Sequence, residues 1–360
     1  MGFNPHEPYN DLPLLPPKGK VQTEEVLKKC ISATRSLAQL KGAGSLVPNQ
    51  SILINSIPLQ EAKDSSEIEN IVTTQDDLYQ AEVSESNVSS PHTKEVLRYR
   101  TALKKGYEML SRRPISTNLI IEICRTVLDT DIDIRKVPGT KLENPDTKKI
   151  VYTPPEGEEI IRRKLHNLEI FINEDNGLDP LVKLAIIHYQ FEAIHPFGDG
   201  NGRTGRILNI LYLVEQKLLE IPVLYLSRYI INNRNEYYKR LKGVTEKSDW
   251  EPWILYILDA VDKTSLETCE KIVAIKDLMA ETIDFCRENL PKRVYSKELV
   301  ELLFVQPYCK ISFLVEADIA KRQSASEYLK ELEKIGILVG EKKGRETIYK
   351  HPKLLDILST

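Results

Sequence analysis

The 360-residue sequence lacks long apolar segments, clustered cysteines and a strong excess of either charge. No apolar run approaches the roughly 20 residues that span a bilayer, and the first residues lack the pattern of a secretory signal. The five cysteines are scattered without a C-x-x-C pair, which is typical of reduced thiols and does not indicate a zinc site. The net charge of −3 argues against attachment of the whole chain to nucleic acid or to an anionic membrane. We therefore expect a cytoplasmic protein without membrane contact, long enough for two or three domains.

One stretch, 195–206 (HPFGDGNGRTGR), concentrates a histidine, a carboxylate, a carboxamide, glycines and two arginines. Apolar segments with helical spacing flank it at 181–194 and 207–214, so we predict helix, polar loop, helix. The loop then ends at a helix N-terminus, where free N–H groups and the helix dipole favour an anion. Arg203 and Arg206 can share one face of the first helical turn, and glycines let the backbone approach a ligand closely. The pattern predicts a phosphate site with an acid–base group at its rim.

Three other kinds of loop do not fit this stretch. A P-loop requires Lys and then Ser or Thr, but Arg206 and Ile207 occupy those positions. An EF-hand counted from Asp199 lacks the glycine at its sixth position and the acid at its twelfth. His188 and His195 have no third histidine or cysteine beside them to complete a zinc site. A nucleotide site of another type remains.

The residue types in the stretch suggest separate chemical roles. His195 can take a proton from an attacking group, because its pKa lies near working pH, and Asp199 can hold a Mg²⁺ that bridges phosphates. Phe197 is interpreted as an apolar peg that anchors the loop. The phosphate contacts would come from N–H groups of Gly200 and Gly202, the amide of Asn201, and the charges of Arg203 and Arg206. A polar turn with a surface histidine is the plain alternative, and the density of functional groups argues against it.

Helical periodicity predominates elsewhere, so we predict a mainly α-helical fold. Further helices are expected at 23–40, 58–72, 93–110, 118–128, 158–173, 227–241 and 250–280, the last as one or two helices. Turn signals in 135–155 predict a β-hairpin, which is either a plain connection or an edge for strand addition by a peptide. The tyrosines and asparagines of 227–241 can line a pocket for a flat ring or simply pack half-buried. Residues 1 to about 20 are proline-rich and expected to be extended over another surface or disordered.

The character of the chain changes near residue 288. A short helix at 296–304, a helix pair at 316–321 and 324–335, and a hairpin between 337 and 349 with a basic tip predict a winged helix-turn-helix. The second helix of the pair carries several glutamates, so protein contact or a structural role is favoured over DNA binding. We therefore predict an N-terminal segment (1–90) ending in a polar linker (84–90), a core (91–280), and a winged-helix domain (288–360).

The 195–206 stretch matches H-x-F-x-[DE]-G-N-G-R-x-x-R at every fixed position and so resembles Fic-domain proteins. Residues 151–155 are similar to the end of the family's target-docking flap, and 226–238 are similar to its nucleotide-base helix. The resemblance covers about 30–275 and implies a Fic-type helical bundle with a β-hairpin flap. It also implies AMP transfer from ATP, with Mg²⁺, to a Ser, Thr or Tyr hydroxyl of a target protein or of the chain itself, releasing pyrophosphate. The target would dock on the 135–155 hairpin, and a homodimer is compatible with this interpretation.

The same resemblance implies roles for individual residues. His195 would be the general base, Asp199 the Mg²⁺ ligand, and Arg206 the γ-phosphate contact. Asn233, with Tyr229, would meet the adenosine. The rest of the predicted nucleotide-binding set consists of Gly200, Asn201, Gly202, Arg203, Thr204 and Gly205.

The 65–70 segment (SSEIEN) resembles the family's inhibitory pattern [ST]-x-x-x-E-[GN], although by periodicity alone 58–72 is an ordinary amphipathic surface helix. The resemblance implies that Ser65 and Glu69 belong to the inhibitory segment, and that Glu69 pairs with Arg206 and blocks the γ-phosphate, because a carboxylate and a phosphate compete for the same donors. Two other functions stay open: AMP removal, with Glu69 orienting a hydrolytic water, and a DNA-binding regulator whose core senses ATP. The target protein cannot be identified from the sequence.

Overall fold

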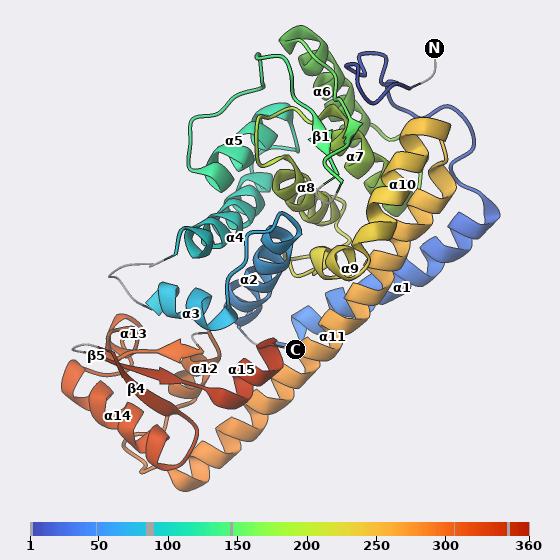
Figure 1. Cartoon of the computed structure of the whole chain (residues 1–360). Coiled ribbons are helices and arrows are strands. Elements are labelled where there is room, and N and C mark those ends of the chain that lie inside the picture. Colours follow the sequence, from blue (N-terminus) through green and yellow to red (C-terminus); the bar gives the residue numbers. More distant parts are fainter. Residues whose placement is uncertain are drawn as a thin grey trace.

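The structure is a computed structural model that describes residues 3–47, 49–83, 90–144, 147–305, 307–343 and 346–359. Helices predominate, and the described strands form two small antiparallel sheets, ordered β1-β2 and β3-β5-β4. The predicted mainly α-helical class with a hairpin is thereby confirmed. Figure 1 shows a helical body that carries the hairpin, with a smaller C-terminal part at the far end of α11. No helix in the described ranges combines the length and the apolar character that crossing a membrane requires.

The elements follow one another as the sequence predicted, with several different ends. Up to the 195–206 stretch they are α1 (Glu24–Ser45), α2 (Ser51–Ile68), α3 (Gln75–Val83), α4 (Pro91–Leu110), α5 (Thr117–Leu128), β1 (Leu142–Glu143), β2 (Ile150–Tyr152), α6 (Glu158–Asn173) and α7 (Pro180–Ile194). After it come α8 (Asn201–Glu215), α9 (Leu226–Asn232), α10 (Arg234–Lys247), α11 (Trp250–Asn289), α12 (Lys297–Val305), β3 (Tyr308–Cys309), α13 (Ile311–Glu316), α14 (Arg322–Lys334), β4 (Val339–Lys343), β5 (Glu346–Lys350) and α15 (Pro352–Ser359). The short helices α3 and α15 were not predicted.

Helix α7 lies at the centre of the body because its apolar residues are spread around the whole helix, which favours burial on all sides. His188, near its middle, is a core residue: its Nε2 lies 2.9 Å from the Tyr237 hydroxyl and its ring stacks on Trp253. Helix α8 is also buried along most of its length. The loop between α7 and α8 is therefore fixed at both ends by the core.

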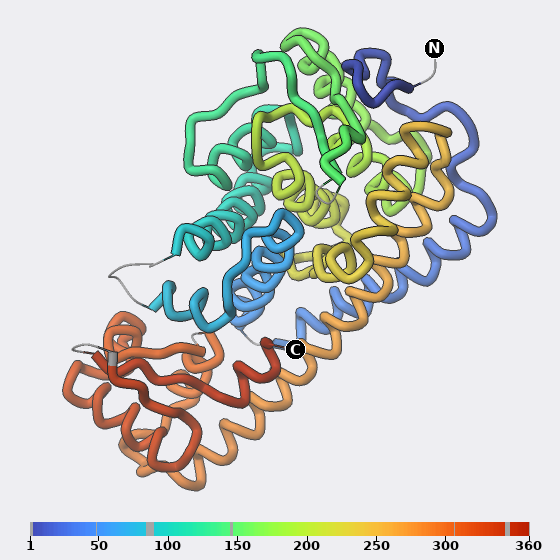
Figure 2. Tube along the Cα trace, in the orientation of Figure 1, coloured from blue at the N-terminus to red at the C-terminus, as the bar shows by residue number. Residues whose placement is uncertain are grey.

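Helices α1 and α11 run side by side along one flank of the body (Figure 2). The predicted 250–280 region is one uninterrupted helix, α11. Asp262 of α11 joins the pair, because its carboxylate accepts hydrogen bonds from Lys29 Nζ, Ser32 Oγ and Ser36 Oγ at 2.8, 2.8 and 2.5 Å.

The proline-rich N-terminal segment lies over the body as an extended strap. Lys164 Nζ donates to the Leu12 carbonyl at 2.6 Å, and Asn167 both donates to and accepts from the backbone of Leu15. Leu12 and Leu15 are buried, so the expected extended course is observed for the described part of this segment.

Helix α2 differs from the predicted 58–72 helix at both ends. It begins at Ser51 and continues through Pro58, whose missing N–H is tolerated because apolar side chains before and after it are buried. It ends at Ile68, because Asn70 adopts a left-handed conformation with φ of 64°. The predicted 227–241 helix is also interrupted: Asn233 separates α9 from α10, and its Nδ2 donates to the Tyr229 carbonyl at the end of α9.

The C-terminal part combines a three-stranded sheet with flanking helices. The helix predicted at 316–321 is wrong, because α13 ends at Glu316 and Asp318 turns the chain with φ of 54°. Ile319 N then donates to the Leu314 carbonyl at 2.9 Å, and α14 follows close to its predicted position. Residues 344–345 of the predicted basic tip and 84–89 of the predicted linker lie outside the described residues. The winged-helix assignment and the three domain boundaries stay predictions.

We expect Leu37→Ala in α1 to lower the free energy of unfolding by about 2–5 kcal/mol, because Leu37 is fully buried and its loss leaves a cavity. Urea unfolding followed by circular dichroism measures the change. Ile31→Ala on the same helix is the matched control, since Ile31 is 63% exposed and its loss should cost no more than about 0.5 kcal/mol. Equal losses in the two variants would contradict the observed packing of α1.

Candidate active site

The loop between α7 and α8 is held in one conformation by its own residues. His195 ends α7 in the left-handed region, with φ of 48°. Phe197 is buried without exposed surface, as predicted for an apolar peg. Asn201 binds the Phe197 backbone twice, accepting from its N–H and donating to its carbonyl, each at 2.9 Å. The Asn201 amide, predicted to contact phosphate, therefore positions the loop, and its contact with phosphate stays a prediction.

Glu69 bridges the two arginines of the stretch. Its Oε1 lies 2.7 Å from Arg206 Nη2, and its Oε2 lies 2.8 Å from Arg203 Nε. Ser65 adds two contacts to Arg206, accepting from Nε at its hydroxyl (2.7 Å) and from Nη2 at its carbonyl (2.9 Å). The predicted pairing of Glu69 with Arg206 is present in the structure, and the contacts of Ser65 with Arg206 and of Glu69 with Arg203 are additional.

Backbone geometry explains why an asparagine follows Glu69. Because Asn70 takes the left-handed conformation that ends α2, Glu69 stands at the C-cap of the helix. From this position its carboxylate reaches the first turn of α8. Gly202 is equally constrained, since a Cβ there would lie 2.6 Å from Glu69 Oε1 and 2.8 Å from Arg206 Nη1. The ion pair therefore requires a residue without a side chain at position 202.

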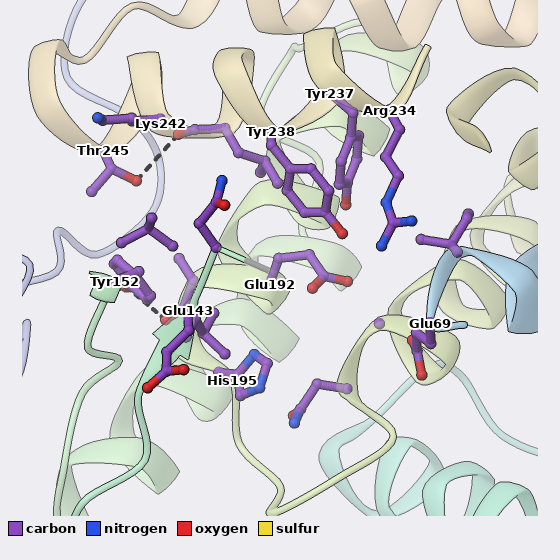
Figure 3. A pocket seen from close by; sticks show the side chains of 18 of the residues that line it. Glu69, Glu143, Tyr152, Glu192, His195, Arg234, Tyr237, Tyr238, Lys242 and Thr245 are labelled. Atoms are coloured by element: carbon purple, nitrogen blue, oxygen red, sulfur yellow. Dashed lines mark hydrogen bonds between the residues drawn. The ribbon is translucent and has the colours of Figure 1, made fainter. Parts of the chain in front are cut away.

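A cavity of about 700 Å³ lies between this loop, the β1-β2 hairpin and α10 (Figure 3). Its floor contains His195, Asp199 and Arg206, and the hairpin contributes Val151 and Tyr152. The Tyr152 hydroxyl donates to the Ala193 carbonyl at 2.7 Å, which fixes the hairpin to α7. The opposite wall is the α10 face that carries Arg234, Tyr237, Tyr238, Lys242 and Thr245. The hairpin predicted in 135–155 therefore forms one side of the site.

His195 is available as a neutral base. Burial, and then the nearby charge of Arg135, lower the pKa of His195 to about 4. Arg135 Nε donates to the His195 carbonyl at 2.8 Å, so this cation also holds the backbone at the end of α7. His195 Nδ1 is buried and has no hydrogen-bond partner among the described residues. The imidazole is thus unprotonated near neutral pH and can accept a proton.

The metal assignment depends on Asp199 alone. Its side chain is 72% exposed at the cavity, and its Oδ1 lies 3.5 Å from Arg203 Nη2. The described residues contain no group of three His, Cys, Asp or Glu side chains that could hold a metal by themselves. An exposed single carboxylate fits Mg²⁺, which keeps water ligands and takes the others from phosphate oxygens.

Several predicted ligands lie away from the cavity surface. Tyr229 packs against Tyr256, and Asn233 occupies the break between α9 and α10, so neither lines the cavity. Arg203 is 1% exposed beneath Glu69. Thr204 and Gly205 are buried in α8, where Gly205 leaves room for Phe191 and Glu192. The stretch brings His195, Asp199, Gly200, Asn201, Gly202 and Arg206 to the cavity.

Sequence reasoning missed two acids beside the arginines. Glu95 of α4 pairs with Arg203, and nothing in its local sequence distinguishes it from a surface residue. Glu192 lies three residues before His195, and residues three apart on a helix lie on the same face, so Glu192 is expected near His195. Burial raises the pKa of Glu192 to about 7, with Arg206 lowering it and Glu69 raising it. Its carboxylate, in a helix whose other residues include no acid, was the available signal.

We expect the His195 ring to stay neutral from pH 7 down to about pH 5, because its pKa is lowered to about 4. A histidine in the unfolded chain has a pKa near 6.5, so it takes up a proton at a higher pH than His195 does in the folded chain. The free energy of unfolding is therefore expected to fall as the pH drops from about 6.5 to about 4. NMR titration of the ring C–H signals, assigned with His195→Gln, measures the pKa. A midpoint near 6.5 would show that the ring is not buried as described.

Comparison with known proteins gives three family matches. A Fic/DOC family N-terminal region matches residues 27–108, and the Fic/DOC family itself matches residues 114–213, which includes the whole loop. The C-terminal domain of SoFic-like protein adenylyltransferases matches residues 278–354.

Individual relatives agree with these matches. Protein adenylyltransferase fic-1 of Caenorhabditis elegans is 32% identical over 105 residues, which are 29% of this chain and 19% of that protein. Its Caenorhabditis briggsae counterpart is 30% identical over 145 residues, 40% of this chain and 26% of that protein, so the similarity spans about a quarter or less of these two relatives. A crystal structure of a Fic family protein from Desulfovibrio desulfuricans G20 has the same fold, with a TM-score of 0.60, 17% identity, and 94% and 98% of the two chains covered. The chain belongs to the Fic/DOC family and carries a C-terminal domain of the SoFic-like type.

Proposed function

We propose that this chain transfers AMP from ATP to a Ser, Thr or Tyr hydroxyl of a target protein, and that Glu69 restrains the reaction. The observation that carries the proposal is a single cavity in which a neutral histidine stands beside a helix N-terminus with two arginines. Helix N-termini bind anions, and guanidinium groups bind phosphate oxygens. The relatives described as protein adenylyltransferases agree with this chemistry.

In the proposed reaction the target hydroxyl oxygen attacks the α-phosphorus of ATP. A new P–O bond forms, the bond from the α-phosphorus to the oxygen bridging to the β-phosphorus breaks, and pyrophosphate leaves. His195 accepts the hydroxyl proton. Backbone N–H groups at the start of α8, with Arg206, stabilise the negative charge on the phosphates, and Arg203 supports them from below.

A Mg²⁺ held by Asp199 and by phosphate oxygens would offset the charge of the triphosphate. The exposure of the Asp199 carboxylate leaves space for the water ligands of the ion. The nucleoside would lie along α10, where Tyr238 and Thr245 face the cavity in place of the predicted Tyr229 and Asn233. The target would dock against the β1-β2 hairpin, which borders the same cavity.

Inhibition by Glu69 is proposed on the ground of direct competition. While the carboxylate holds Arg206 at 2.7 Å and Arg203 at 2.8 Å, the donors that a γ-phosphate needs are occupied. Withdrawal of Glu69 from this position would release one contact of Arg206 and one of Arg203 at once, while Ser65 stays bonded to Arg206 and Glu95 stays paired with Arg203.

We expect Glu69→Gly to raise AMP transfer on the order of 10- to 100-fold, since it removes charge-assisted contacts of about 1.5–3 kcal/mol. His195→Ala in that background should lower the rate by about 10²- to 10⁴-fold. Transfer of label from α-³²P-ATP to the chain itself and to lysate proteins measures both changes.

Glu67→Gly is the matched control for glycine near the end of α2, because Glu67 pairs only with Lys63 in the described structure and does not line the cavity. Its activity should stay near that of the wild type. If Glu69→Gly transfers no label to any protein, the proposed function is wrong. If Glu67→Gly activates equally, release of the arginines is not the cause.

We expect Asp199→Asn, in the Glu69→Gly background, to raise the Mg²⁺ concentration that gives half-maximal transfer by about tenfold or more, because a neutral amide binds a hard cation more weakly than a carboxylate does. A Mg²⁺ titration at saturating ATP measures the shift. Glu143→Gln removes another carboxylate of the same cavity, on β1, and is the matched control. An unchanged Mg²⁺ requirement in Asp199→Asn would remove Asp199 from the proposed metal site.

A further inference from the structure

Arg234 is a charged residue of the cavity that lies outside the 195–206 stretch. It is the first residue of α10, is half-buried, and lines the cavity. Its Cζ lies 5.9 Å from the centre of the Tyr238 ring, which supports one face of the guanidinium. Figure 3 shows the guanidinium directed into the cavity on the side of Glu69, whereas Lys242 and Thr245 lie toward the opposite end.

The guanidinium of Arg234 has no counter-charge in the described structure. It forms neither an ion pair nor a hydrogen bond with any described residue, although Glu69 and Glu192 border the same cavity. The neighbouring cations on α10 differ in this respect, since Lys239 pairs with Glu236 at 3.4 Å and Lys242 with Glu246 at 3.5 Å. A partly desolvated charge without a partner is costly, which favours an anionic ligand beside it.

The position of Arg234 on α10 adds to this cost. The positive end of the helix dipole lies at the N-terminus, so a cation there is electrostatically unfavourable. Asn233, which precedes it, makes no side-chain cap for α10, because its Nδ2 donates to Tyr229 instead. An anion at this end of the cavity would offset both the guanidinium and the uncapped N–H groups.

We propose that Arg234 binds the terminal phosphate of the nucleotide, a role that rests on the proposed function of the cavity. Arg206 is occupied by Glu69 in this structure, so Arg234 is the guanidinium left free at the phosphate end. Arg234 therefore contributes to nucleotide affinity whether or not Glu69 is seated. It binds the end of the triphosphate that leaves, and it does not contact the AMP portion.

The experiment compares equilibrium binding of ATP, ADP and AMP to the full chain by calorimetry. The variants are Arg234→Gln and Arg240→Gln, each with Glu69 intact and with Glu69→Gly. Arg240 is the matched control, because it lies on the same helix, pairs with Glu236 at 2.5 Å and does not line the cavity. Thermal unfolding of each variant verifies that the fold is kept.

We expect Arg234→Gln to weaken ATP binding by about 10- to 100-fold in both Glu69 backgrounds, because it removes a hydrogen bond between a charged donor and the terminal phosphate. AMP has no terminal phosphate at this position, so its affinity should stay within about twofold of that of the parent chain. Arg240→Gln should change none of the three affinities. An ATP affinity unaffected by Arg234→Gln, or an equal loss for ATP and AMP, would overturn the role in terminal-phosphate binding. Failure of every variant, including Glu69→Gly alone, to bind any nucleotide would overturn the proposed function itself and this inference with it.

Discussion

The contact on which the rest of the site depends is the bridge from one carboxylate to two arginines. Glu69 holds Arg203 and Arg206 together at 2.8 and 2.7 Å, and both guanidinium groups are almost fully buried. Buried charges are stable only when they are paired, so these two cations need an anion at all times. Glu69 supplies it to both in this structure, with Glu95 as a second partner of Arg203, and in the proposed reaction the phosphates of a nucleotide would replace Glu69. The proposed inhibition is thus an exchange of one anion for another.

Polar contacts and aromatic packing hold the helix that carries this carboxylate. Glu61 of α2 accepts hydrogen bonds from the Ser227 backbone N–H at 3.0 Å and from the Tyr99 hydroxyl at 3.1 Å, and burial raises its pKa to about 7. The helix that follows α2 along the chain, α3, contacts the C-terminal part of the protein, because its Tyr79 ring stacks on the Tyr308 ring of β3. The position of Glu69 therefore depends on residues far from it in sequence.

The helices α5, α7 and α8 could be predicted because each carries a local apolar pattern strong enough to indicate a helix. The ends of α2 and the break at Asn233 could not be predicted in this way. Pro58 is tolerated inside α2 because buried side chains surround it, and the Asn233 amide donates to the Tyr229 carbonyl at the end of α9. The same limit applies to the site. The position of its loop between two helices was predicted from the sequence, whereas Glu95 and Arg234 come from separate helices whose local sequences do not distinguish them.

The sequence by itself determined which chemical groups the loop carries. The apolar segments on either side of it predicted a loop that ends at a helix N-terminus, where an anion is favoured. It also indicated which glutamate would pair with Arg206. Only the tertiary structure decided that Glu69 spans both arginines, that Asn201 holds the loop, and that α10 supplies the far wall with an unpaired guanidinium. Those facts depend on distances between helices that are remote along the chain, and no local pattern encodes such distances.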